Sequence, residues 1–224
     1  MIITNRYRAD YQGEFVITNT RWANGKKEQE REWIPNQIEN YHISGRAAVI
    51  GSTLDQDRFD FKRLEKHKGG LLGQKRLQTY GSGHLWKQMT FDFYVTTSDQ
   101  QLQDVTRLGY SDQNIVYTTA KNIIKYPGKF YLVPHIGHID ELALAVYLAA
   151  FDGHEEVFLH GYNNETHNET GTVTWKENVS AVFKAYTSTQ FILVGTETNM
   201  PESWRENRNV KCMDFRDFVT YCDV

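Results

Sequence analysis

From Gly45 onward, short apolar runs rich in β-branched and aromatic residues alternate with segments of helical periodicity. Near-continuous apolar strands are typical of parallel sheets, because the connecting helices bury such strands on both faces. The alternation therefore predicts an α/β fold, a Rossmann-like, mostly parallel sheet with helices on both faces. The expected strands are 46–50, 70–74, 91–96, 114–117, 130–133, 156–160, 190–194 and 210–213. The expected helices are 56–66, 83–89, 99–108, 140–152, 174–187 and 214–221.

The segment 140–152 gives the clearest helix pattern, with apolar residues on two faces. One stripe contains Leu142, Ala143, Val146 and Ala150, and the other contains Leu144, Leu148 and Phe151. A helix that is apolar on two faces is buried between layers. Asp140 is suited to cap its N-terminus and Gly153 to end it. We therefore expect this helix in the middle of the architecture.

The first 44 residues follow a different pattern. The runs 14–22 and 30–38 look extended, and Asn24-Gly25 lies between them. Asn-Gly is a strong hairpin signal because both residues tolerate positive φ. We expect residues 1–44 to form an N-terminal β-hairpin extension and residues 45–224 to form one Rossmann-like α/β domain. The extension is interpreted as a structural flap, with a lid or an oligomer arm as alternatives.

Composition excludes several classes of protein. The chain has 224 residues and a net charge of −3, so there is no basic excess and we expect no dedicated nucleic-acid surface. No apolar run is long enough for a membrane span, and the first residues lack the apolar stretch of a signal peptide. Two cysteines, Cys212 and Cys222, make neither a disulfide framework nor a zinc knuckle. We expect a cytoplasmic protein, and a homo-oligomer stays open.

Two glycine-containing turns are candidate ligand sites. In open parallel sheets, ligands bind beyond the carboxyl ends of the strands, where the strand order reverses. The expected strand 46–50 runs into Gly51, Ser52 and Thr53, and the second turn contains Gly81 and Ser82. Glycine allows close approach of the backbone to a ligand, and exposed amides at a helix N-terminus bind phosphate. Neither turn matches the dinucleotide fingerprint or the P-loop, and a simple tight turn or a flexible loop is the alternative.

Two further strand ends carry polar groups. Asp99 follows the strand 91–96 and could cap the next helix or bind a ribose or acceptor hydroxyl. The strand 156–160 ends in Gly161, Tyr162 and Asn163, whose polar groups suit sugar hydroxyls or a base edge. We include all four residues in the candidate binding site.

The segment from His135 to Glu141 is the densest group of ionisable residues. His135 and His138 stand between an expected strand and the helix that begins near Asp140. A histidine at a strand end can act as general base or acid near neutral pH. The two histidines could instead bind a metal with Asp140, but a fourth ligand is lacking, or they could be structural.

Taken in order, these turns resemble a known pattern. The run 49–54, the run 92–95 with Asp99, the helix 142–150 and the run 159–163 resemble the corresponding segments of Campylobacter-type bacterial sialyltransferases and the related motility-accessory and pterin-pyrophosphokinase-like proteins. The resemblance spans roughly Gly45 to Asn164. It implies a Rossmann-like domain that binds a nucleotide-activated sugar, often a cytidine monophosphate donor and frequently without a metal. It also implies a histidine as general base near the acceptor.

Three functions follow from these observations. The first is a glycosyltransferase-like enzyme that uses a nucleotide sugar as substrate with an unknown acceptor, with no cofactor and with His135 or His138 as general base. The second is another nucleotide-dependent transferase, pyrophosphokinase-like and metal-dependent, with Asp92, Asp99 and Asp140 as metal ligands. The third is a non-catalytic accessory or structural protein, for example of a phage.

Overall fold

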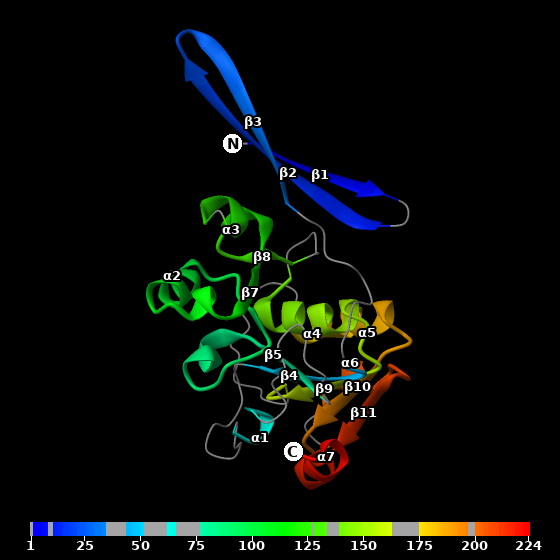
Figure 1. The fold of residues 1–224 in the computed structure, drawn as a ribbon. Helices are drawn as coiled ribbons and strands as arrows, with labels where there is room; N and C mark the ends of the chain where they lie inside the picture. The colour runs from blue at the N-terminus through cyan, green and yellow to red at the C-terminus, as the bar shows by residue number, and fades with distance from the viewer. Residues whose placement is uncertain are drawn as a thin grey trace.

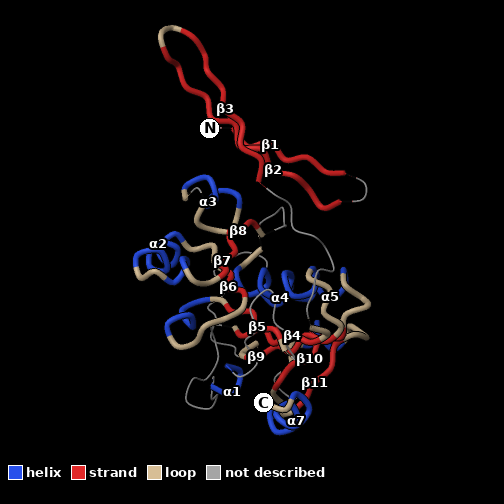
Figure 2. Tube along the Cα trace, viewed as in Figure 1, coloured by secondary structure: helices blue, strands red, loops and turns tan. Residues whose placement is uncertain are grey.

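A computed structural model describes residues 2–8, 11–34, 44–51, 62–65, 77–126, 128–133, 139–162, 175–196 and 200–224. Its main body is an eight-stranded sheet in the order β11-β10-β9-β4-β5-β6-β7-β8, and every neighbouring pair is parallel (Figures 1 and 2). The strands are β4 (Arg46–Ile50), β5 (Gln78–Gly81), β6 (Phe93–Val95), β7 (Ile115–Thr118), β8 (Tyr131–Leu132), β9 (Glu156–His160), β10 (Gln190–Val194) and β11 (Val210–Met213). The helices are α1 (Lys62–Glu65), η2 (Gly83–Lys87), α2 (Asp99–Arg107), η3 (Tyr110–Asp112), α3 (Ala120–Lys125), α4 (Glu141–Phe151), α5 (Trp175–Ala185), α6 (Glu202–Arg205) and α7 (Phe215–Cys222).

The strand order reverses between β4 and β9. Strands β4 to β8 lie one after another toward one side, and the chain then returns to place β9, β10 and β11 on the other side of β4. Ile50 and His160 are partners in the β4–β9 ladder, and the Gly51 N–H donates to the His160 carbonyl oxygen at 2.9 Å. The carboxyl ends of β4 and β9 therefore mark the position at which open α/β sheets bind ligands.

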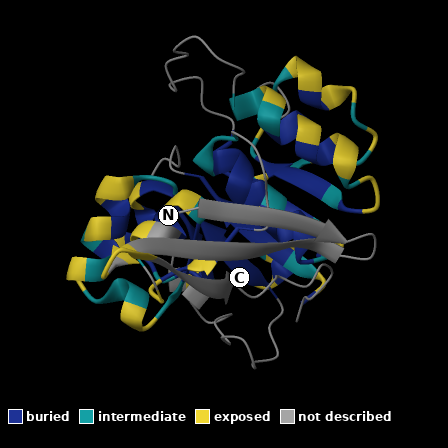
Figure 3. Cartoon of the chain, turned by 90° about the horizontal axis from the view of Figure 1, so that it is seen from above, coloured by how far each residue is buried: buried dark blue, intermediate teal, exposed yellow. Residues whose placement is uncertain are grey.

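Both faces of the sheet are covered by helices. In β4, Ala47 and Val49 belong to the core shared with α4, α5 and α6, whereas Ala48 and Ile50 belong to the core shared with α1, η2, α2, α3 and α7. This alternation follows from the two-residue period of a strand. Figure 3 shows buried residues in the centre and exposed residues on the outer helices. The predicted Rossmann-like fold with helices on both faces is confirmed.

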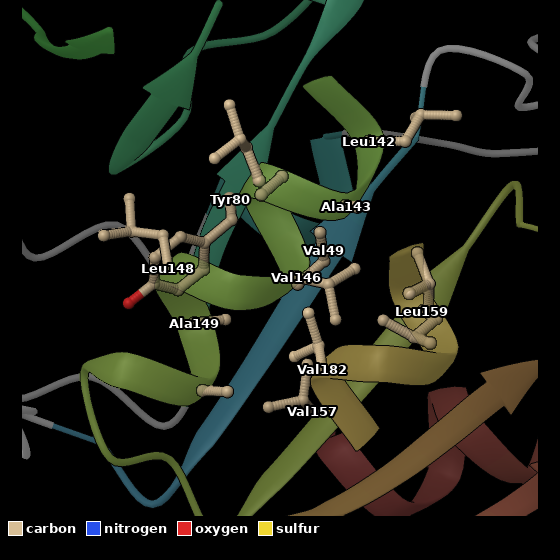
Figure 4. Close-up of a cluster of buried hydrophobic side chains, with 14 of the residues drawn as sticks. Val49, Tyr80, Leu142, Ala143, Val146, Leu148, Ala149, Val157, Leu159 and Val182 are labelled. Atoms are coloured by element: carbon tan, nitrogen blue, oxygen red, sulfur yellow. The ribbon is translucent and has the colours of Figure 1, made fainter. Parts of the chain in front are cut away.

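Helix α4 lies between the sheet and α5, as its two apolar faces predict. Every residue from Leu142 to Phe151 except Tyr147 is buried. Figure 4 shows side chains from β4, β5, β9 and α5 around the helix. Asp140 Oδ1 accepts a hydrogen bond from the Ala143 N–H at 2.9 Å and caps the N-terminus. Gly153, with φ of 88°, directly follows the C-cap, as expected of a glycine that ends a helix.

The N-terminal segment is a three-stranded antiparallel sheet of β1 (Ile2–Arg8), β2 (Tyr11–Ala23) and β3 (Lys26–Ile34). The predicted hairpin is confirmed, and it turns at Asn24 and Gly25, whose φ angles are 53° and 73°. The sequence did not predict β1, which adds a third strand. In Figure 1 this sheet extends away from the parallel sheet. Its assignment as a separate extension, residues 1–44, stays a proposal.

Strand β5 is the main element that the sequence analysis missed. The expected strand 70–74 lies outside the described residues, and β5 follows a few residues later at Gln78–Gly81. The strand was not predicted because the polar residues Gln78 and Thr79 interrupt the apolar pattern of a buried strand. Thr79 is nevertheless 1% exposed, and its N–H and hydroxyl both donate to Asp92 Oδ2 at 2.9 Å. Pairing with β4 and β6 thus overrides the weak local pattern.

The remaining differences concern helices. The predicted helix at 83–89 is the short 3₁₀ helix η2, and α3 and α6 were not predicted. Within the described ranges, no helix is long and apolar enough to cross a bilayer.

Shortening a side chain of α4 tests the importance of its burial. Leu148→Ala removes a side chain that is 0% exposed, and we expect a loss of about 2–5 kcal/mol in the free energy of unfolding. Urea denaturation measures this loss. Leu108→Ala is the matched control, because Leu108 is 63% exposed and its truncation is expected to change stability by less than about 0.5 kcal/mol. Equal losses in the two variants would contradict the central role of α4.

Candidate functional site

The carboxyl edge of the sheet brings together the ends of β4, β5, β6 and β9 and the N-terminus of α4. The best-defined side chain at this edge is Glu141, the first residue of α4. Its Oε1 accepts a hydrogen bond from the Gly83 N–H at 3.2 Å, and the Thr96 hydroxyl and Thr97 N–H also hydrogen-bond its carboxylate. Glu141 therefore joins the loops that follow β5 and β6 to the start of the buried helix.

The pKa of the Glu141 carboxyl lies above its ordinary value, because burial outweighs the hydrogen bonds that the carboxylate accepts. Burial is the largest effect and raises the pKa of its carboxyl, and the nearby charge of Asp140 also raises it. The hydrogen bonds from Thr96, Gly83 and Thr97 favour the carboxylate and act in the other direction. A partly desolvated carboxyl group at the carboxyl edge of the sheet can accept hydrogen bonds from hydroxyl groups of a ligand.

Ser82 lies next to this cluster and contributes a buried hydroxyl to the edge. It is 1% exposed, and its hydroxyl has no hydrogen-bond partner within the described residues. Close by, the Tyr94 hydroxyl donates to the Gly83 carbonyl oxygen at 2.6 Å and also contacts the Gln101 side chain. A buried hydroxyl without a partner is costly and calls for an explanation, such as a group that binds there.

The acidic side chains proposed as metal ligands bond to the protein itself. Asp92 accepts from Thr79, Asp99 forms an ion pair with Lys125 at 2.7 Å, and Asp140 Oδ2 accepts from the Asn178 amide at 2.8 Å. Among the residues that the structure describes, no three or more His, Cys, Asp or Glu side chains gather where they could hold a metal ion.

The two candidate glycines make room for protein atoms. A Cβ added at Gly51 would lie 3.1 Å from Leu142 Cδ2 and 3.2 Å from Tyr162 Cε2. At Gly81 it would lie 2.4 Å from the Phe91 ring. Both residues are buried. Close packing around β4 and β5 thus accounts for both glycines.

The structure places the other candidates as follows. Gly161 directly follows β9 with φ of 74°, and Tyr162 is fully buried, with its hydroxyl donating to the Leu142 carbonyl oxygen at 2.9 Å. Ser98, and not Asp99, caps α2, because its side chain accepts from the Gln101 N–H. The candidates Ser52, Thr53, His135, His138 and Asn163 lie outside the described residues.

Glu141 was not predicted as a site residue, although it ends the segment 135–141 that stands out for its ionisable residues. The missed signal was position, because an acid in the first turn of a buried helix that follows a parallel strand must lie at the carboxyl edge.

A separate groove of about 950 Å³ runs between α4 and α5, from Ile139 and Asn178 near this edge to Thr189. It faces the helix layer and is distinct from the strand ends.

Comparison with known proteins finds similar solved structures. No protein-family model matches the chain, and no curated protein matches it. An apo alpha-2,3-sialyltransferase from Campylobacter jejuni is 8% identical over 71% of this chain and 79% of its own, with a TM-score of 0.45. The monofunctional alpha-2,3-sialyltransferase Cst-I of Campylobacter jejuni is 10% identical over 84% and 86%, with a TM-score of 0.43. The sialyltransferase CstII of the same organism, in complex with the substrate analogue cytidine-5'-monophosphate, is 10% identical over 66% and 79%, with a TM-score of 0.37.

These are the proteins that the order of the turns resembles. The comparison therefore confirms a weak, partial match to Campylobacter sialyltransferases. It carries no statement about the activity of this chain.

A substitution at Gly81 tests its packing role. In Gly81→Ala the new methyl group collides with Phe91, so we expect a loss of about 1–3 kcal/mol in the free energy of unfolding by urea denaturation. The control is Gly45→Ala, where the nearest atom would be Glu155 Oε2 at 3.8 Å. Adding Phe91→Leu to Gly81→Ala should cost less than the sum of the two single changes. Strict additivity would argue against the contact.

Proposed function

We propose that the protein is a glycosyltransferase-like enzyme that binds a nucleotide-activated sugar at the carboxyl edge of the sheet. The observation that carries the proposal is the buried, unpartnered hydroxyl of Ser82 beside Glu141, near the reversal of strand order. A site of this kind, with polar groups converging at a strand edge, is where open α/β sheets bind nucleotides. The resemblance of the turns to those of sialyltransferases agrees with this class of substrate.

The charges at the edge favour particular parts of the donor. Asp140 and Glu141 place carboxyl groups at the N-terminus of α4, where they compensate the positive end of the helix dipole. Hydroxyl groups of a ribose or sugar suit this position, because they can donate to Glu141 and hydrogen-bond to Ser82. The phosphate of the donor would lie over the turn of Gly51, Ser52 and Thr53, away from these acids. Gly161 and Asn163 would line the opposite side, and the buried Tyr162 would support them through its hydrogen bond to the start of α4.

His135 and His138 are the proposed general bases. Support comes from their place in the chain, because they lie between β8, which ends at Leu132, and α4, which begins at Glu141. A neutral histidine would take the proton of the acceptor hydroxyl as its oxygen bonds to the sugar. As this bond forms, the bond between the sugar and the phosphate breaks, and the nucleotide leaves with the electron pair.

Removing the Ser82 hydroxyl separates a binding role from a structural one. Ser82→Ala eliminates an unsatisfied buried hydroxyl, so the ligand-free protein should be as stable as wild type or more stable. Nucleotide-sugar affinity should fall about tenfold if one hydrogen bond is lost. Calorimetry with cytidine and uridine nucleotide sugars measures the affinity.

The control for Ser82→Ala is Ser203→Ala, which removes a serine hydroxyl from α6 and should leave affinity unchanged. A thermal-shift screen with the same nucleotide sugars, with and without EDTA, tests the proposal directly. Stabilisation that EDTA does not remove supports it. Stabilisation only with a metal would indicate the pyrophosphokinase-like alternative, and no stabilisation by any nucleotide would indicate a non-catalytic protein.

The histidine variants test the chemistry. We expect His135→Ala or His138→Ala to lower turnover about 10²–10⁴-fold while donor affinity is kept, because a general base acts on the reaction and not on donor binding. His84→Ala is the control, since His84 is exposed on η2. Full turnover in both single variants and in the double variant would exclude a histidine base.

A further inference from the structure

A buried hydrogen-bonded cluster joins three elements at the amino-terminal edge of the sheet. Tyr80 of β5 is 0% exposed, Asp152 at the end of α4 is 7% exposed, and His154 is 0% exposed. The Tyr80 hydroxyl oxygen lies 2.6 Å from Asp152 Oδ2 and 2.9 Å from His154 Nε2. The other ring nitrogen, Nδ1, contacts the carbonyl oxygen of Ser44, just before β4. The cluster therefore ties the C-terminus of α4 to β5 and to the chain that enters β4.

The three contacts of the cluster need three hydrogens, one more than the side chains supply when Asp152 is ionised and His154 is neutral. The Ser44 carbonyl can only accept, so His154 Nδ1 carries a hydrogen, and in a neutral imidazole Nε2 is then an acceptor. An ionised Asp152 also can only accept. The Tyr80 hydroxyl has one proton and could satisfy only one of these two neighbours. The other close contact would have no hydrogen in it.

One added proton on Asp152 places one hydrogen in each of these three contacts. The acid O–H of Asp152 donates to the Tyr80 oxygen, Tyr80 donates to His154 Nε2, and His154 Nδ1 donates to Ser44. Placing the proton on His154 would instead bury two charges, which burial disfavours. Asp92 and Tyr117 are the side chains of other elements that act electrostatically on Tyr80. Neither carries a positive charge that would stabilise an ionised Asp152. Burial also raises the pKa of Asp152 to about 7, against the effect of its hydrogen bond with Tyr80.

We propose that Tyr80, Asp152 and His154 form a neutral proton-holding relay that fastens the end of α4 to β4 and β5 and opens when Asp152 ionises. After ionisation Tyr80 donates to the carboxylate and no longer to His154 Nε2. Because α4 also carries Glu141 at its other end, the relay makes the anchoring of the site helix sensitive to pH.

The direction of the pH effect follows from linkage. An aspartate in the unfolded chain has a pKa of about 3.9, whereas the pKa of Asp152 in the folded protein is about 7. Between these values the folded state keeps a proton that the unfolded state has lost. The stability that the protonated relay contributes is therefore complete below about pH 4, falls as pH rises, and is lost once the pH has passed through about 7.

Asp152→Asn tests the relay, because the amide N–H can donate to Tyr80 at every pH. Urea unfolding is measured between pH 5 and 8 for wild type and variant. We expect the ratio of the wild-type unfolding constant to that of the variant to rise about tenfold per pH unit up to about pH 7 and then to level off. The control is Asp214→Asn, at the N-cap of α7, which asparagine also caps and whose ratio should stay constant. A constant ratio for Asp152→Asn would overturn the proposal.

A second measurement needs no substitution and no activity. Infrared spectra of wild-type protein labelled with [¹³C]aspartate report protonated aspartate directly. A carboxylic-acid band from aspartate at pH 6 that disappears by pH 8 supports the relay. The absence of that band at pH 6 overturns it. Neither measurement involves a nucleotide, so a failure here is distinct from a failure of the proposed glycosyltransferase function.

Discussion

The burial of α4 on every side is the constraint on which the rest of the structure depends. A helix with apolar residues on two faces is stable only when both faces are covered. The sheet covers one face through β4, β5 and β9, and α5 covers the other (Figure 4). The order of layers on this side is therefore sheet, α4 and α5, because α4 needs the middle strands on one face and another helix on the other.

Because α4 is held along its length, its two ends become fixed points with different chemistry. Its N-terminus carries Asp140 and Glu141 to the carboxyl edge, where Glu141 meets the Gly83 N–H. Its C-terminus carries Asp152 to the amino edge, where the Tyr80 hydroxyl lies 2.6 Å away. Strand β5 takes part at both ends, with Tyr80 in the relay and Ser82 at the candidate site. One helix and one strand thus contribute residues to both clusters.

The sequence predicted the strands and helices in which the spacing of apolar residues matches one type of secondary structure only. The bounds of β4, β9, β10 and β11 match the expected strands. β4, β9 and β10 each contain a continuous apolar run, and in β11 Lys211 interrupts it. The hairpin at Asn24-Gly25 was predictable for a local reason, because these two residues tolerate positive φ. Strand β5 was not predictable in this way. Half of it is polar, and it is a strand because β4 and β6 pair with it on both sides.

By itself the sequence determined the alternation of strands and helices, the burial of α4 and the side of the sheet on which ligands are expected. Only the tertiary structure decided what fills the space at each strand end. Gly81 faces a ring ten residues away, and Tyr80 meets Asp152 from a distance of 72 residues along the chain. Periodicity reports which face a residue occupies, whereas packing and hydrogen bonding depend on which distant residue shares that face. That is why Gly81 proved to be a packing residue and why Glu141 and the unpartnered Ser82 hydroxyl came to define the candidate site.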